Sequence, residues 1–314
     1  MWTVKSPKNA RKEGSMRGLI TCLKSGDYMI LDLDTKQTMQ AKASGLFRHH
    51  GEKPKVGDYV EYQLMDDTKA YITKLEDRKN DLVRPAICNI DQAFVVFSVK
   101  DPDFNTNLLD RFLTILNYNN IDAILIFTKW DLLTKDEEKE IKVYQEYYEK
   151  IGYRVIEVDK NSDVELFQQT IKDLLKDKIT VITGQSGVGK STILNVLDDK
   201  LNLTVNDISY ALGRGKHTTR HVEIYQLYDG MLADTPGFGI MDFSGMAEID
   251  IAQSFKEFFE YSNECKYKGC LHINEPNCKV KELVELDKLS KKRYQRYVEI
   301  YNEISKRRII YEKD

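Results

Sequence analysis

Short apolar runs separated by glycine-containing turns dominate residues 17–75. The stretch RGLITCLKSGDYMILDL places a Ser-Gly-Asp turn between two β-prone runs, and residues 53–75 follow the same pattern. Short strands and such turns over about 60 residues predict a small closed β-barrel, an OB-fold, although an SH3-like barrel would give nearly the same pattern. The aromatic side chains of this stretch are expected either to fill the barrel core or to stack on bases: Tyr28, Phe47, Tyr59 and Tyr62.

From Gln92 the pattern changes to alternating strands and helices, which predicts a parallel sheet covered by helices. Between the expected strands, the stretch NTNLLDRFLTILN repeats leucine and phenylalanine at helical spacing. Thr134 with Glu137 predicts a capping box at the start of the next helix, and Ser162 with Glu165 predicts another. We expect strands at residues 93–99, 122–127, 153–158, 179–183, 222–228 and 231–234.

A third pattern begins after Phe243. The stretch EIDIAQSFKEFFEYSN is helical in its spacing, a group of cysteines and a histidine follows, and we expect a basic helix over 284–308. The chain is therefore predicted to be multidomain. We expect a β-barrel at 1–80, an α/β nucleotide-binding domain at 81–245 and a mainly helical, metal-binding domain at 246–314.

Composition is that of an ordinary globular protein, with 314 residues of which 31% are charged. The first stretch, MWTVKSPKNARKEG, is polar and basic without an apolar core, so we expect no secretory signal. The most apolar stretches, QAFVVFSV and AILIF, are too short to cross a bilayer. We therefore expect a cytoplasmic protein without a membrane partner.

Charge is unevenly distributed, although the formal net charge is only −3. The first 20 residues hold five Lys or Arg against one Glu, and residues 261–314 hold 13 Lys or Arg against nine Asp or Glu. Basic ends around an acidic middle favour a polyanion held by the two flanks. Two solvated basic helix faces would give the same counts.

A phosphate-binding loop follows the expected strand at 179–183. Its sequence matches G-x-x-x-x-G-K-[ST] at every fixed position, and the helical stretch STILNVL comes next. Glycines let consecutive backbone N–H groups surround phosphate oxygens, and the start of a helix adds its positive end. Lys190 is expected to reach the β- and γ-phosphates, and the Ser191 hydroxyl to bind Mg²⁺. The nucleotide-binding residues expected here are Gly184, Gln185, Ser186, Gly187, Val188, Gly189, Lys190, Ser191 and Thr192.

Two further motifs indicate the base and the γ-phosphate. In ADTPGF, Asp234 ends a strand, where it can hold Mg²⁺ through water, and the Gly237 amide can sense the γ-phosphate. Upstream stands TKWD, that is Thr128, Lys129, Trp130 and Asp131. The Asp131 carboxylate can accept hydrogen bonds from N1–H and the N2 amine of guanine, and adenine offers no such pair of donors. Lys129 would lay its alkyl stem over the ring. Beside a phosphate loop and DTPG, this motif favours GTP.

Three cysteines and one histidine lie within 14 residues: Cys265, Cys270, His272 and Cys278. Cysteines in a chain without a secretory signal argue against a disulfide framework, and Cys22 and Cys88 are expected to be ordinary core residues. Four soft ligands at close spacing suit one closed, tetrahedral, structural Zn²⁺ site, and an iron–sulfur cluster is the other use of such a group. Zinc would contribute on the order of 10 kcal/mol to folding a segment this small.

The order of the nucleotide motifs is unusual. The set resembles that of the translational GTPases, in which the phosphate loop precedes the base motif, yet here Asp131 precedes Gly184 by 53 residues. The chain therefore resembles a circularly permuted GTPase. A barrel, a permuted GTPase domain and a Cys/His group together resemble the ribosome-small-subunit-dependent GTPase A (RsgA) family over nearly the whole chain.

This resemblance implies a function and partners. The family assists maturation of the small (30S) ribosomal subunit, so it implies a GTP hydrolase that binds 16S rRNA through its barrel and zinc domains. It makes residues 213–220 switch I, in which Thr218 or Thr219 would bind Mg²⁺ and His217 would position the water or remain an exposed loop residue. We expect a monomer.

The chain departs from the usual motifs at three places. Thr128 replaces the asparagine of the base motif, and the base-capping motif is degenerate, with VDKNSD at 158–163 as its candidate. Phe238 stands where Ras-type enzymes place a water-orienting glutamine. Because phenylalanine cannot hydrogen-bond a water, we expect hydrolysis that is slow alone and stimulated by the subunit, with Lys190, His217 and Gly237 as the catalytic residues.

Two alternatives from other classes remain. The first is a GTP-gated RNA-binding switch whose hydrolysis is incidental, which the degree of stimulation by small subunits would distinguish. The second is a P-loop ATPase or a nucleotide-dependent nuclease. Asp131 argues against ATP, and the sequence has no acidic or histidine cluster suited to nuclease chemistry.

Overall fold

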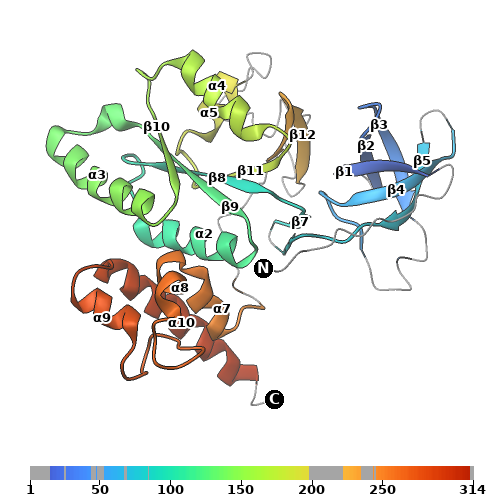
Figure 1. The fold of residues 1–314 in the computed structure, drawn as a ribbon. Helices are drawn as coiled ribbons and strands as arrows, with labels where there is room; N and C mark the ends of the chain where they lie inside the picture. The colour runs from blue at the N-terminus through green and yellow to red at the C-terminus, as the bar shows by residue number, and fades with distance from the viewer. Residues whose placement is uncertain are drawn as a thin grey trace.

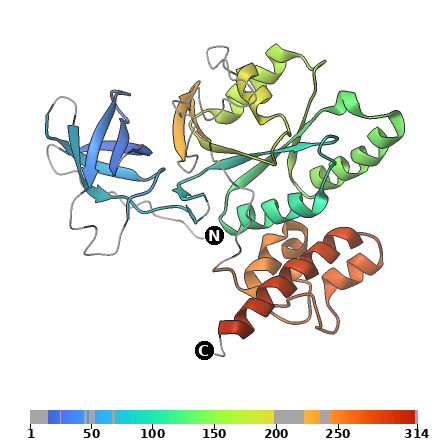
Figure 2. The ribbon, with the colours of Figure 1, turned by 180° about the vertical axis from the view of Figure 1, so that it is seen from behind.

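The computed structural model describes residues 15–24, 26–43, 47, 53–66, 69–83, 85–197, 222–234, 243 and 245–311, without the side chains at 234 and 308–311. Figures 1 and 2 show three parts, namely a β-barrel, a helix-covered sheet and a group of helices beside that sheet. Within the described residues, no helix is both long and apolar enough to cross a membrane.

The N-terminal part is a five-stranded barrel. Its strands are β1 (Met16–Lys24), β2 (Asp27–Asp32), β3 (Thr38–Ala43), β4 (Tyr59–Leu64) and β5 (Lys69–Leu75). They pair in the order β1-β2-β3-β5-β4, and β4 returns to β1 to close the barrel. The β3–β5 pair is parallel and the others are antiparallel, which is the arrangement of an OB-fold. Tyr62 and Phe47 are buried in the core, whereas Tyr28 and Tyr59 are half-buried.

A short hairpin of β6 (Asp81–Leu82) and β7 (Ile87–Cys88) connects the barrel to the central sheet. The central strands are β8 (Gln92–Ser98), β9 (Asp122–Thr128), β10 (Arg154–Val158), β11 (Ile179–Thr183), β12 (Glu223–Leu227) and β13 (Gly230–Asp234). Their order is β10-β9-β8-β11-β13-β12, and β12 joins β1 of the barrel through the pair Cys22 and Glu223. All six strands lie within one residue of their predicted ends.

The prediction of a parallel sheet is wrong for one strand. β8, β9, β10, β11 and β13 are parallel, but β12 is antiparallel to β13. Only Tyr228 and Asp229 separate these two strands, with Tyr228 in a left-handed conformation at φ 52°. A connection of two residues can make a hairpin but not the crossover that a parallel pair needs.

Helices cover both faces of the central sheet, which explains its unbroken apolar strands. Val95 and Phe97 of β8 face one core with α2 (Thr106–Tyr118) and α3 (Lys135–Lys150). Phe94 and Val96 face a second core with α4 (Val164–Leu175) and α5 (Lys190–Leu197). The capping box of Thr134 and Glu137 at the start of α3 is confirmed.

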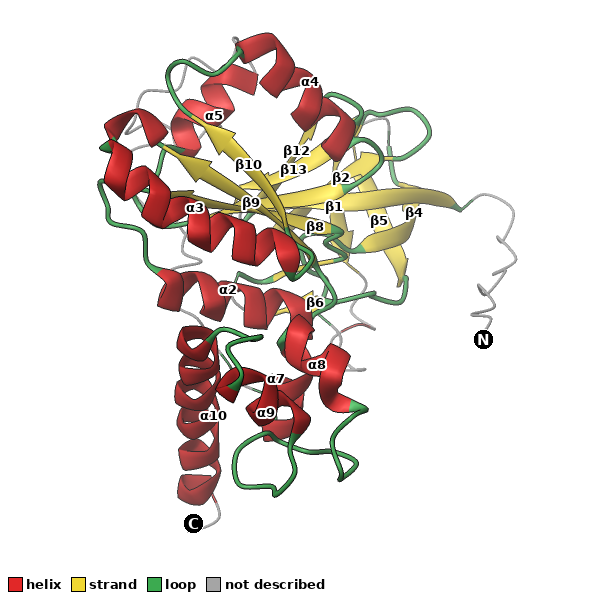
Figure 3. Cartoon of the chain, turned by 60° about the vertical axis from the view of Figure 1, so that its left-hand side comes forward, coloured by secondary structure: helices red, strands yellow, loops and turns green. Residues whose placement is uncertain are grey.

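The C-terminal part consists of short helices around one long helix (Figure 3). They are α7 (Glu248–Ser254), α8 (Lys256–Ser262), α9 (Lys279–Glu285) and α10 (Lys291–Tyr311). The single basic helix expected over 284–308 is in fact two, because the chain turns between α9 and α10 with Asp287 at φ 55°. Phe255, Phe258 and Tyr297 are buried and belong to the same core as α2, so this part packs on one face of the central sheet.

Candidate nucleotide and metal sites

The nucleotide motifs meet at the carboxyl edge of the central sheet. β9 ends at Thr128 and leads into residues 129–131, β11 ends at Thr183 and leads into the glycine loop, and β13 ends at Asp234. These three strands run in the same direction, and only β8 lies between β9 and β11. In open α/β sheets this edge is where ligands bind. The structure thus brings TKWD and the glycine loop together, although their order along the chain is permuted.

A hydrogen bond joins the two motifs directly. The Thr128 hydroxyl donates to the backbone oxygen of Val188 at 2.7 Å, and Thr128 is 5% exposed. A side chain placed on Gly189 would come within 3.8 Å of the same hydroxyl. The threonine that replaces the expected asparagine therefore still holds the glycine loop.

The glycine loop has a backbone that only glycine tolerates at its start. Gly184 has φ +146°, and a Cβ on it would stand 2.1 Å from the Val96 backbone oxygen. Val188 is fully buried in the second core and anchors the middle of the loop. The Lys190 ammonium donates to the Gly184 oxygen at 2.7 Å and to the Gln185 oxygen, so it is held at the loop. α5 begins at Lys190, and its first turn adds the positive end of a helix.

A pocket of about 310 Å³ lies between the base motif and α5. Most of the lining that concerns the motifs comes from two groups of residues. The predicted residues Thr128, Lys129, Asp131, Gly189 and Thr192 line it, together with Val158, Asp159, Lys160 and Ser162. Trp130 is absent from this lining. Its indole N–H donates to the Phe127 oxygen at 3.1 Å and the Lys142 ammonium lies 4.6 Å from its ring centre, so Trp130 anchors the motif to the fold.

Asp131 forms an ion pair inside this pocket. Its Oδ2 lies 3.0 Å from Nζ of Lys160, and its side chain is 12% exposed. The hydrogen bond from Lys160 is the main reason that the pKa of Asp131 is lowered. The carboxylate is therefore ionised and can only accept hydrogen bonds, as recognition of N1–H and the N2 amine of guanine requires.

The segment after β10 differs from its prediction. Ser162 does not cap the following helix, because Asp163 does so by accepting from the Leu166 N–H at 3.0 Å. The Ser162 hydroxyl instead accepts from the Asp159 N–H at 2.8 Å and closes a turn around Lys160. Lys160 was not among the predicted site residues, although it lies inside residues 158–163, the base-capping candidate.

Several predicted residues fall outside the described part of the chain. These are His217, Thr218, Thr219 and Gly237, together with Phe238 and the side chain of Asp234. For Asp234 the structure describes only the backbone, at the end of β13. The roles of these residues stay predictions.

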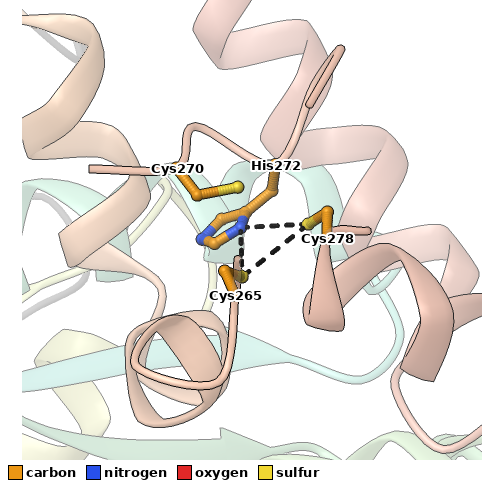
Figure 4. Close-up of side chains that lie close together, drawn as sticks. All are labelled: Cys265, Cys270, His272 and Cys278. Atoms are coloured by element: carbon orange, nitrogen blue, oxygen red, sulfur yellow. Dashed lines mark hydrogen bonds between the residues drawn. The ribbon is translucent and has the colours of Figure 1, made fainter. Parts of the chain in front are cut away.

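The four expected zinc ligands are gathered in one place (Figure 4). Their ligand atoms all lie within 4.8 Å of one another. His272 Nδ1 lies 3.4 Å from Cys278 Sγ and 3.7 Å from Cys265 Sγ, and the latter two sulfurs are 4.0 Å apart. Zn–S bonds of about 2.3 Å at tetrahedral angles would place the ligands about 3.5–3.8 Å apart. The geometry therefore fits a tetrahedral zinc ion.

The chemistry of this group also fits a metal. His272 is fully buried, and burial lowers the pKa of its imidazole, which keeps the ring neutral and able to bind a metal. Burial raises the pKa of the Cys270 thiol to about 12. Burial also raises the pKa of the Cys278 thiol, so a bound cation is what would favour the thiolates at Cys270 and Cys278. All five cysteines are free, and Cys22 and Cys88 are buried core residues as expected.

Side chains other than the four ligands position the loop around His272. Glu275 accepts from the backbone N–H groups of Leu271 at 2.6 Å and Ile273 at 2.9 Å. From α10, the Tyr294 hydroxyl donates to the His272 oxygen at 2.7 Å, and the Tyr297 hydroxyl donates to the Leu271 oxygen. None of these three residues was predicted. Glu275 lies within the loop itself, whereas Tyr294 and Tyr297 are distant from it in sequence.

A buried ion-pair network joins the helical part to the central sheet. The Arg293 guanidinium of α10 pairs with Asp110 of α2 and with Glu257 of α8, and all three residues are at most 3% exposed. The Tyr148 hydroxyl of α3 also donates to Asp110, at 2.6 Å. Four helices from the two parts therefore meet at one arginine.

Comparison with known proteins matches this architecture. Residues 17–72 match the family model of the RsgA N-terminal domain, and residues 75–244 match that of the RsgA GTPase. The chain is 46% identical over 285 residues to the small ribosomal subunit biogenesis GTPase RsgA 2 of Oceanobacillus iheyensis, covering 90% of this chain and 96% of that one. It is 44% identical over 290 residues to the RsgA protein of Bacillus subtilis, with the same coverage.

Two solved structures are similar over almost their whole length. One is described as the crystal structure of YloQ, a circularly permuted GTPase, with a TM-score of 0.79 and 39% identity over 95% of this chain and 99% of that one. The other is YjeQ from Thermotoga maritima, with a TM-score of 0.79 and 29% identity over 92% and 98%.

Proposed function

This chain belongs to the RsgA family of small ribosomal subunit biogenesis GTPases, and from that membership we propose how its parts act. It is a circularly permuted GTP hydrolase that converts GTP and water to GDP and phosphate. We propose that it binds the 30S subunit in the cytoplasm as a monomer, assists late maturation, and hydrolyses GTP slowly until the subunit stimulates it.

The proposed division of labour follows the predicted domains. The barrel at 1–80 and the zinc domain at 246–314 contact 16S rRNA, and the GTPase domain at 81–245 times release by hydrolysis. Arg293 of α10 pairs with residues of both α2 and α8. A movement of the zinc domain when it binds rRNA would therefore be transmitted to α2, which follows β8 at the nucleotide-binding edge of the sheet. Binding through phosphates is expected to weaken steeply with salt.

The proposed site roles rest on the carboxyl edge of the sheet. Asp131 reads the guanine, Thr128 and the glycine loop position the phosphates, and Lys190 neutralises charge on the γ-phosphate. Mg²⁺ bound with GTP would neutralise further phosphate charge, with Ser191, Asp234 and one of Thr218 or Thr219 as its ligands. His217 and the Gly237 amide complete the proposed catalytic set.

One observation carries this assignment, namely the pocket that Asp131 and Gly189 line together. The Asp131 carboxylate lies beside the phosphate loop there, which supports the proposal that a single nucleotide spans both motifs. A separate observation, the four ligand atoms within 4.8 Å of one another, supports one structural Zn²⁺ at Cys265, Cys270, His272 and Cys278.

GTP turnover with and without added small subunits tests the proposal, comparing the wild type with Ser191→Ala. We expect large stimulation in the wild type and little turnover in the variant, because the variant loses a Mg²⁺ ligand. GTP-dependent subunit binding with unstimulated turnover would instead identify a GTP-gated switch. His217→Ala separates the role of that residue, since unchanged stimulated turnover would exclude it as the water-positioning group.

A further inference from the structure

A lysine lies in the base pocket beside the carboxylate that reads guanine. Lys160 Nζ stands 3.0 Å from Asp131 Oδ2, and both residues line the pocket together with Gly189. The Lys160 side chain is 70% exposed, and its ion pair with Asp131 is the contact that keeps the ammonium group at the pocket.

The backbone around Lys160 is held in place by strand pairing and by hydrogen bonds within a turn. β10 pairs with β9 in a fixed parallel register that sets Val158 opposite Thr128. Two hydrogen bonds then close the turn, from the Asp159 N–H to the Ser162 hydroxyl and from the Asn161 N–H to the Asp159 carboxylate, each 2.8 Å long. Lys160 is therefore presented next to the base motif by the sheet itself.

The two charged groups complement the edge of guanine. That edge carries two donors, N1–H and the N2 amine, followed by one acceptor, O6. An ionised carboxylate can only accept hydrogen bonds, so Asp131 can read the donors but gains nothing from O6. An ammonium has three donor hydrogens, so Lys160 can keep its bond to Asp131 and donate another to an adjacent acceptor.

We propose that Lys160 is a specificity-determining residue whose ammonium donates to guanine O6 while Asp131 accepts from N1–H and the N2 amine. The inference rests on the proposed guanine site. Adenine presents an amine where guanine presents O6, so the ammonium would face a donor there. Lys160 thus favours guanine and disfavours adenine with the same group.

Equilibrium binding of three nucleotides to the full chain tests this inference: GDP, 6-thio-GDP and ADP. 6-Thio-GDP keeps N1–H and the N2 amine but replaces O6 with sulfur, which is a poor acceptor. We expect Lys160→Met to weaken GDP binding about fivefold, as for loss of a charge-assisted bond from a largely exposed lysine, and to weaken 6-thio-GDP binding much less. The preference for GDP over ADP should fall by at least the same factor.

Two controls separate the possible failures. Lys139→Met removes another exposed lysine with a carboxylate partner, Asp136 at 2.9 Å, and should leave all three affinities unchanged. Asp131→Ala should weaken GDP more than tenfold, and if it does not, the proposed guanine site is itself wrong. If Asp131→Ala weakens GDP but Lys160→Met weakens GDP and 6-thio-GDP equally, Lys160 acts only through Asp131 and the inference is overturned. Tighter GDP binding by Lys160→Met would overturn it too, because the lysine would then be a competitor of guanine.

Discussion

The Thr128 hydroxyl donates to the Val188 backbone oxygen across 60 residues of chain, at 2.7 Å. This bond joins the end of the strand that carries the base motif to the middle of the loop expected to hold the phosphates. It is buried, so water cannot replace the threonine as a donor. The two halves of the nucleotide site therefore depend on one another's position.

Removing this hydroxyl should weaken nucleotide binding. Thr128→Val keeps the shape of the side chain but leaves the buried Val188 oxygen without its donor, which costs about 1–3 kcal/mol. We expect a GDP dissociation constant raised about tenfold and a lower midpoint of thermal unfolding, measured by calorimetry. Thr128→Ser keeps a hydroxyl and should retain most of the affinity.

Thr114→Ala is the matched control for that change. Thr114 is equally buried and donates to the Asp110 oxygen at 2.8 Å, but it lies in α2 away from the pocket. It should lower thermal stability without changing GDP affinity. If Thr114→Ala weakened GDP binding as much as Thr128→Val does, the Thr128 hydrogen bond would affect GDP binding only through the stability of the whole fold.

Loss of a zinc ligand should release the metal. Cys278→Ser removes one of four ligands from a buried group, so we expect bound zinc to fall from one equivalent to near zero. The backbone amides of the helices after Phe243 should then lose protection from hydrogen exchange. Metal analysis of the purified protein and hydrogen exchange measure the two effects. Cys22→Ala, at a buried cysteine of the barrel, should keep one equivalent of zinc.

The buried arginine should be costly to remove. Arg293→Met leaves Asp110 and Glu257 buried without their cation, and breaking such a network costs about 3–5 kcal/mol. Urea unfolding should show this loss of stability. Arg307→Met, which breaks the exposed pair with Glu303, should change stability by less than about 1 kcal/mol.

A compensated variant distinguishes charge from packing at this network. Combining Arg293→Met with Asp110→Asn and Glu257→Gln removes all three charges, so much of the lost stability should return. If the triple variant is as unstable as Arg293→Met alone, the loss comes from packing around Tyr148 and Phe255 rather than from unpaired carboxylates.

Acid should remove the contribution of Glu137 to stability. The hydrogen bond from Lys100 is the main reason that the pKa of Glu137 falls to about 2, and the bonds at Thr134 add to it. Because this folded pKa is lower than the ordinary 4.5, the contribution is complete above about pH 5 and is lost as the pH falls toward 2. The difference in unfolding free energy between the wild type and Glu137→Gln should therefore shrink as the pH falls from about 5 toward 2.

Lys100→Met checks the cause of that pKa shift. Without the ammonium, the pKa of Glu137 should move back toward 4.5, as a carboxyl-carbon titration by NMR would show. An unchanged titration would mean that Thr134 alone holds the carboxylate ionised.

Much of the fold follows from local pattern. Strand positions in the central sheet, a small β-barrel and the capping box at Thr134 were predictable because apolar periodicity, glycine turns and cap residues act over a few neighbouring positions. The antiparallel β12 and the break before α10 were not predicted, although the two-residue connection at Tyr228 did carry the signal for the first of these.

The sequence by itself determined which residues we propose to carry the chemistry: the glycine loop, Asp131 and the four residues of the Cys/His group. These patterns are local, since each depends on spacing within a few residues. Only the tertiary structure decided that Thr128 holds Val188, that Lys160 pairs with Asp131, and that Arg293 of α10 pairs with residues of α2 and α8. Such contacts arise from strand order and helix packing between segments that are distant in sequence, so no local sequence pattern predicts them.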